Sequence, residues 1–154
     1  RSSDLDNLHK LILKYNNMCA ICHNAINHFK SIDLSGLSTR KVDENSFYSM
    51  KYLEGLDELS MTFHQISLID PNMFGPLKQL KKLKLECDDQ LERLGERTFE
   101  HQINLLDLDL MLNEIIEIDA QAFYGLENLK ILKLNQLDSN QFQFQANTFI
   151  HLFG

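Results

Sequence analysis

The sequence predicts an α/β repeat solenoid, with a curved parallel β-sheet on its concave side and turns or short helices on its convex side. Two observations lead to this fold class. Leucine accounts for 27 of the 154 residues, and a chain so rich in one residue is searched first for internal repeats. Apolar residues then recur along almost the whole chain at intervals close to 24 residues, a length typical of one repeat of a solenoid.

The clearest copy of the repeat begins at Leu105. With Leu105 as position 1, apolar residues occupy positions 1, 4, 6, 11 and 14, and Asn113 occupies position 9. Phe123 and Leu126 occupy positions 19 and 22 of the same copy. Because side chains alternate along a strand, a strand around positions 3 to 7 would send positions 4 and 6 inward and positions 3, 5 and 7 outward.

The repeat occurs six times in tandem. Its sixth position is occupied in turn by Leu13, Leu34, Met61, Leu85, Leu110 and Leu134, at spacings of 21, 27, 24, 25 and 24 residues. Since one copy cannot bury its apolar edge without neighbours, we expect residues 1–154 to form a single solenoid segment of about six repeats. Its strands are predicted near residues 10–14, 31–35, 58–62, 82–86, 107–111 and 131–135.

The six tandem copies resemble the leucine-rich repeat family. The stretch Ala-Phe-Tyr-Gly-Leu-Glu-Asn-Leu at 122–129 resembles the 24-residue class of animal extracellular proteins and Toll-like receptor ectodomains. The resemblance implies that an asparagine at position 9 turns inward and bonds the backbone of adjacent loops. The residues at this position are Asn16, Leu37, His64, Asp88, Asn113 and Leu137. Two copies therefore keep the asparagine, one has an aspartate that could partly replace it, and three depart from it.

A second apolar row is expected on the convex side, near position 19 of each copy. Its members are Ile26, Phe47, Phe74, Phe99, Phe123 and Phe149. Neither end of the chain shows the polar capping unit that a solenoid needs to close its core. We therefore expect a segment of a longer solenoid, or ends that are covered by another chain.

Composition and charge narrow the class of protein. Fifteen lysine and arginine residues against 22 aspartate and glutamate residues give a formal net charge of −7, and 44% of the residues are hydrophobic. This composition is typical of a folded domain, and charged residues interrupt every apolar stretch, so direct membrane insertion is not expected. An acidic chain is poor in the cationic groups that replace counterions on nucleic acid, so no nucleic-acid partner is expected.

The three cysteines leave several interpretations open. Cys19, Cys22 and His23 form the C-x-x-C-H string that marks c-type haem attachment, but a haem also needs an enclosing pocket and an axial partner. A zinc site would need a fourth ligand. A Cys19–Cys22 disulfide fits a turn, and two small buried apolar side chains are the simpler alternative. Cys87 is expected to be unpaired within the chain, and no cofactor or metal is expected.

No arrangement of side chains points to catalysis. The six histidines share no repeat position, and no set of nucleophile, base and orienting residue can be assembled. Asp107 and Asp109 lie two residues apart on one strand face, and paired carboxylates can serve acid–base chemistry. On the outward face of a solenoid sheet such a pair is more often a charged binding surface or simply solvated. The chain is therefore predicted not to be an enzyme.

The outward positions of the strands form the expected binding surface. They combine charged strips with apolar side chains along one edge, a mixture that is typical of protein interfaces. The predicted protein-binding residues are Lys10, Lys14, Tyr15, Phe63, Lys82, Lys84, Glu86, Asp107, Asp109 and Met111. A contact through the convex or lateral surface is the alternative, because single exposed apolar residues are common on any protein surface.

These patterns predict a non-catalytic protein-binding module. The resemblance implies a secreted or cell-surface recognition protein, of which a Toll-like receptor ectodomain in innate immune signalling is one example. Its partners would be a protein ligand or a co-receptor, and homo- or hetero-oligomers are compatible with this function. The alternatives are a structural subunit whose uncapped ends dock on other chains and an intracellular adaptor in the cytoplasm. The absence of an Asn-x-Ser/Thr sequon counts against a glycosylated ectodomain.

Overall fold

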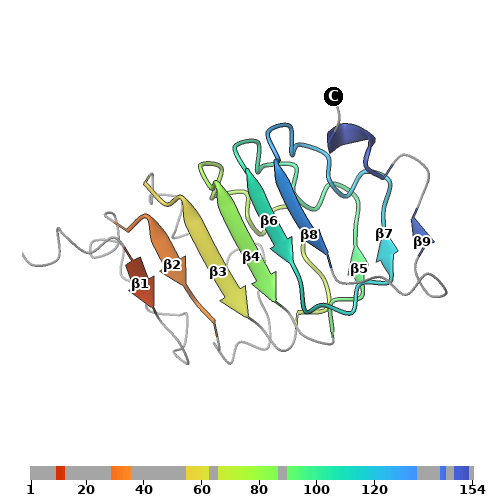
Figure 1. Ribbon diagram of the computed structural model, residues 1–154. Coiled ribbons are helices and arrows are strands. Elements are labelled where there is room, and N and C mark those ends of the chain that lie inside the picture. Colours follow the sequence, from red (N-terminus) through yellow and green to blue (C-terminus); the bar gives the residue numbers. More distant parts are fainter. Residues whose placement is uncertain are drawn as a thin grey trace, which may run out of the picture.

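The computed structural model describes residues 10–12, 29–35, 55–62, 66–86, 90–134, 143–144 and 148–152. These parts of the chain form a solenoid of parallel strands with two sheets, one on each side (Figure 1). In the described ranges, no helix has the length and apolar character needed to cross a membrane.

The larger sheet follows the chain from one repeat to the next. Its six strands lie in the order β1-β2-β3-β4-β6-β8, and every neighbouring pair is parallel. The strands are β1 (Lys10–Ile12), β2 (Ser31–Asp33), β3 (Glu58–Thr62), β4 (Lys82–Glu86), β6 (Asp107–Leu110) and β8 (Ile131–Leu134). Each begins at the residue where the repeat pattern predicts a strand to begin.

The alternation of apolar and polar residues explains which side of this sheet faces the core. In β6, Leu108 and Leu110 are fully buried, whereas Asp107 and Asp109 face outward. The same two inward positions are buried in β4, where they are Leu83 and Leu85. In β8, the inward leucines are only half-buried, because no further strand of the described chain pairs with the outer edge of β8.

The opposite side of the solenoid holds a second sheet that the repeat pattern does not predict. It consists of β5 (Arg93–Leu94), β7 (Glu117–Ile118) and β9 (Gln143–Phe144), which are parallel and hydrogen-bonded in this order (Figure 1). Turns follow β5 and β7 in the chain, and the 3-10 helix η3 (Ile150–Leu152) comes after β9. A strand of two residues is too short to show an alternating pattern, so the sequence offers no periodic signal for it.

The predicted row of aromatic rings lies inside the convex side. Phe74, Phe99 and Phe123 are fully buried, and Phe149 packs against the same core while half-buried. The rings of Phe99 and Phe123 are stacked with centroids 6.5 Å apart, and those of Phe123 and Phe149 with centroids 5.7 Å apart. Ile26 and Phe47, the first two members of the predicted row, lie outside the described residues. Phe99, Phe123 and Phe149 thus join three successive repeats by the same stacking contact.

Asn113 performs the role that the family resemblance implies for position 9. Its side chain is buried, and Nδ2 donates to the carbonyl oxygens of Leu85 at 3.0 Å and Leu110 at 2.8 Å. Two exposed side-chain amides make similar bonds. Asn104 donates to the carbonyl of Lys78, and Asn128 donates to the carbonyl of Ile103. Each of these three asparagines ties its repeat to the preceding one.

Gly125 marks the closest approach between two repeats on the convex side. Its φ of 91° lies in the region that favours glycine, and a Cβ placed there would lie 2.5 Å from the backbone oxygen of Glu100. A side chain at this position would therefore push the fifth repeat away from the fourth. Glycine at position 21 of this copy lets the two loops pack.

Candidate functional site on the concave sheet

The concave face is defined here as the outward side chains of β2, β3, β4, β6 and β8. Strand register places these side chains in rows that run across the sheet. The first row is Ser31, Glu58, Lys82, Asp107 and Ile131. The second row is Asp33, Ser60, Lys84, Asp109 and Lys133. Acidic and basic groups therefore alternate between neighbouring strands.

Ion pairs connect the charged side chains within and between strands. Lys82 Nζ lies 3.2 Å from Glu58 Oε1 on β3, and Lys84 pairs with Glu86 on its own strand. These pairs are partly exposed, so each stabilises the fold only slightly. They place charges of opposite sign side by side on the sheet.

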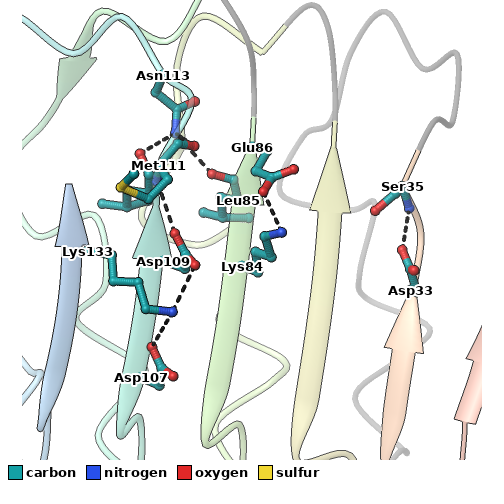
Figure 2. Close-up of polar contacts among 11 residues, drawn as sticks. Asp33, Ser35, Lys84, Leu85, Glu86, Asp107, Asp109, Met111, Asn113 and Lys133 are labelled. Carbon is teal, nitrogen blue, oxygen red and sulfur yellow. Dashed lines mark hydrogen bonds and ion pairs between the residues drawn. The ribbon is translucent and has the colours of Figure 1, made fainter. Parts of the chain in front are cut away.

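Lys133 reaches from β8 to both aspartates of β6, as Figure 2 shows. Its Nζ lies 3.0 Å from Asp109 Oδ2 and 3.8 Å from Asp107 Oδ1. The hydrogen bond to Asp109 and the negative charges of Asp109 and Asp107 raise the pKa of Lys133 above its ordinary value. Lys133 therefore remains protonated throughout the physiological pH range.

Two aspartates at position 5 of their repeats also shape the backbone at the ends of their strands. Asp109 Oδ1 accepts a hydrogen bond of 3.1 Å from the N–H of Met111, and Asp33 Oδ1 accepts one of 3.0 Å from the N–H of Ser35 (Figure 2). Such bonds to the residue two positions on favour a turn. The carboxylates of these two aspartates are therefore held in place by the backbone.

These side chains surround a hollow of about 250 Å³ on the concave face. It extends from β2 to β8, and its charged lining comprises Asp33, Glu58, Lys82, Lys84, Asp107, Asp109 and Lys133. Leu59 and Leu83 also border it, although their side chains are buried in the core on the other side of the sheet. The hollow is thus a polar depression that carries charges of both signs.

The structure brings together five of the predicted binding residues: Lys82, Lys84, Glu86, Asp107 and Asp109. Met111 lies beyond the end of β6, where it and Leu112 are exposed. Lys10 belongs to β1, where the structure describes its backbone. Three further predicted residues, Lys14, Tyr15 and Phe63, lie outside the described residues. The predictions for Cys19, Cys22 and Cys87 also fall outside the described residues.

Three charged residues of the hollow were not among the predicted binding residues. They are Asp33, Glu58 and Lys133. Glu58 occupies position 3 of its copy, and Asp33 and Lys133 occupy position 5 of theirs, the same outward positions as Lys82 and Lys84. The repeat pattern therefore predicts that all three side chains point outward. The set of predicted binding residues included too few of these outward positions.

The described ranges contain no group of three histidine, cysteine, aspartate or glutamate residues placed to hold a metal ion. The hollow instead offers hydrogen-bond donors and acceptors with fixed charges. Such a surface can bind a partner with complementary charges. These charges contribute more to the specificity of binding than to its affinity.

Family models match most of the chain. Residues 4–105 match the model described as a BspA type leucine rich repeat region, and residues 79–142 match the model described as leucine rich repeat. The chain belongs to the leucine-rich repeat family. This confirms the resemblance found in the repeat pattern and agrees with the parallel solenoid described above.

The chain is also similar to individual proteins of known sequence or structure. Toll-like receptor 3 of Boselaphus tragocamelus is 26% identical over 160 residues, which cover 96% of this chain and 17% of that protein. A crystal structure of the mouse RP105/MD-1 complex matches with a TM-score of 0.67 and 26% identity, covering 82% of this chain and 22% of that one. A TLR13–ssRNA13 complex matches with a TM-score of 0.60 and 22% identity, covering 96% of this chain and 24% of that one.

This leucine-rich repeat chain spans about a fifth of the length of the relatives that it matches. The similarity to TLR13 at 22% identity shows the shared fold alone. What these longer proteins bind is a property of the whole proteins.

Proposed function

We propose that this chain is a non-catalytic, protein-binding segment of a secreted or cell-surface receptor, and that its concave face contacts the ligand. The observation that carries the proposal is the charged hollow on the larger sheet, which is lined by five successive strands. Neighbouring charges of both signs are suited to selective recognition of a protein surface with complementary charges. The chemistry of the hollow suits binding better than catalysis.

The relatives support the receptor part of the proposal. Toll-like receptor 3 matches 96% of the chain, and the RP105 structure is a complex with MD-1. On the strength of this likeness to receptors, we propose an extracellular or cell-surface location for the chain. A co-receptor or an oligomer is compatible with the same arrangement, because a solenoid presents its other surfaces to further partners.

A binding screen with matched variants tests the proposal. The chain is immobilised and tested against a panel of purified extracellular proteins. The variant Lys82→Glu/Lys84→Glu reverses two charges of the hollow, and the control Lys78→Glu/Arg93→Glu makes the same change in charge at exposed residues outside it. A ligand that is lost with the first variant and kept with the second supports the concave face. A ligand that binds both variants equally would place the contact elsewhere.

Single-stranded RNA belongs in the same screen, because one structural neighbour is a complex with it. The described concave face carries the carboxylates of Asp33, Glu58, Glu86, Asp107 and Asp109 against the ammonium groups of Lys82, Lys84 and Lys133. This excess of negative charge opposes a phosphate backbone. We therefore predict no binding of RNA to this face at physiological salt.

A further inference from the structure

Two carboxylates lie close together on the β6 side of the hollow. Asp107 and Asp109 lie two residues apart on β6, so both carboxylates face the same side of the sheet. Both side chains are largely shielded, with exposed fractions of 20% and 16%. Among the described residues, Lys133 is the cation within ion-pair distance of both, so these two carboxylates share one ammonium group there.

The two lysines of β4 form ion pairs with glutamates. Lys82 forms its ion pair with Glu58 on β3, and Lys84 forms its pair with Glu86 (Figure 2). Both lysines lie opposite the aspartates of β6 in the strand register, but their ion pairs are with these glutamates. Asp107 and Asp109 therefore depend on Lys133 for their ion pairs within the described chain.

Asp107 is the less satisfied of the two carboxylates. Asp109 accepts hydrogen bonds from the backbone N–H of Met111 and from Lys133. Asp107 Oδ1 is buried, and in the part of the chain that the structure describes no hydrogen-bond donor reaches it, because Lys133 Nζ lies 3.8 Å away. A shielded acceptor without a donor is unfavourable, and a donor supplied by a partner would relieve it.

We propose that this side of the hollow receives an arginine side chain of the protein partner, which takes the place of Lys133 between Asp107 and Asp109. The inference rests on the proposed function, because it names a chemical group of the protein that the concave face binds. A guanidinium has five N–H donors in one plane and can bond both carboxylates at once. Lys133 bonds only Asp109, and its half-exposed ammonium can move into solvent at little cost.

A titration with a small peptide tests the site directly. N-acetyl-Gly-Arg-Gly-amide is added to the isotope-labelled chain, and the backbone amide shifts are followed by NMR. We expect saturable shifts at residues 107–111 and 131–134. The same peptide with citrulline, which has the shape of arginine without its charge, should produce none. Shifts with both peptides, or shifts confined to other residues, would overturn the proposal.

Variants of the chain separate displacement of Lys133 from a general effect of charge. Lys133→Gln removes the internal competitor and should tighten peptide binding about threefold to fivefold. Asp107→Asn or Asp109→Asn should weaken it by about fivefold or more. The control is Lys81→Gln, since Lys81 pairs with Asp57 at 3.0 Å outside the hollow and its loss changes the net charge equally. Equal tightening by Lys81→Gln and Lys133→Gln would contradict the proposal.

The arginine site and the proposed function can fail separately. A protein ligand that is lost with Lys82→Glu/Lys84→Glu but unaffected by Asp107→Asn would leave the proposed function standing and overturn the arginine site. A ligand that weakens with Asp107→Asn and tightens with Lys133→Gln supports both. Failure of every protein in the screen to depend on the concave face would overturn the proposed function, and the arginine site with it.

Discussion

The side-chain amide of Asn113 donates a hydrogen bond of 3.0 Å to the carbonyl of Leu85, which lies 28 residues earlier in the chain. The same amide donates to the carbonyl of Leu110 within its own repeat. One buried side chain thus satisfies backbone groups of two successive repeats. It stabilises the contact between them as well as the turn after β6.

Replacement of Asn113 by alanine should lower the free energy of unfolding by about 1–3 kcal/mol, because it leaves buried carbonyl oxygens without a donor. Urea unfolding followed by circular dichroism measures the change. Asn104→Ala is the matched control, since the bond from Asn104 to the carbonyl of Lys78 is exposed and water can replace it. An equal loss of stability in both variants would contradict the buried hydrogen bonds of Asn113 as the cause.

Gly125→Ala should destabilise the chain by about 1–3 kcal/mol, since alanine must adopt a positive φ and its Cβ meets the backbone of Glu100. A backbone oxygen cannot rotate away as the end of a flexible side chain can. Gly55→Ala is the control, because nothing lies within 4 Å of a Cβ at Gly55. Thermal unfolding of the two variants should differ clearly, and matching midpoints would count against the close approach.

Leu110→Asp should unfold the domain, because it places an unpaired carboxylate in a fully buried position at a cost of about 4 kcal/mol or more. The equivalent change in the next repeat is Leu134→Asp, where the side chain is only half-buried and keeps part of its hydration. The second variant should therefore lose less stability. A soluble, fully folded Leu110→Asp protein would refute the register of the sheet.

The raised pKa of Lys133 gives the chain a defined dependence on high pH. A lysine with a higher pKa in the folded state contributes stability that is complete below its unfolded pKa and is lost as pH rises through the folded value. Lys133→Met should therefore lower stability at neutral pH, with the difference from the parent chain disappearing in strongly alkaline solution. Titration of the Lys133 side chain by NMR measures the pKa, which should fall towards the ordinary value in Asp109→Asn.

The leucines of the repeat were sufficient to locate the strands of the larger sheet, because burial of positions 4 and 6 is the main source of stability in each copy. Leu108 and Leu110 show this in β6. The sequence could not predict the pairing of Lys133 with the aspartates of β6, since that contact depends on side-chain rotamers across two repeats. It also could not predict β5 and β7, which form from backbone hydrogen bonds with no periodic side-chain signal.

The second sheet has a consequence for the shape of the molecule. A solenoid bends when its elements are stacked further apart on one side than on the other. Hydrogen-bonded strands lie about 4.8 Å apart, whereas packed helices lie about 8–10 Å apart. Where β5, β7 and β9 are hydrogen-bonded, the strands have a similar spacing on both sides, so this stretch should curve less than a solenoid with helices on its convex side. Its concave face is therefore suited to a gently rounded partner, rather than to one that must be enclosed in a deep arc.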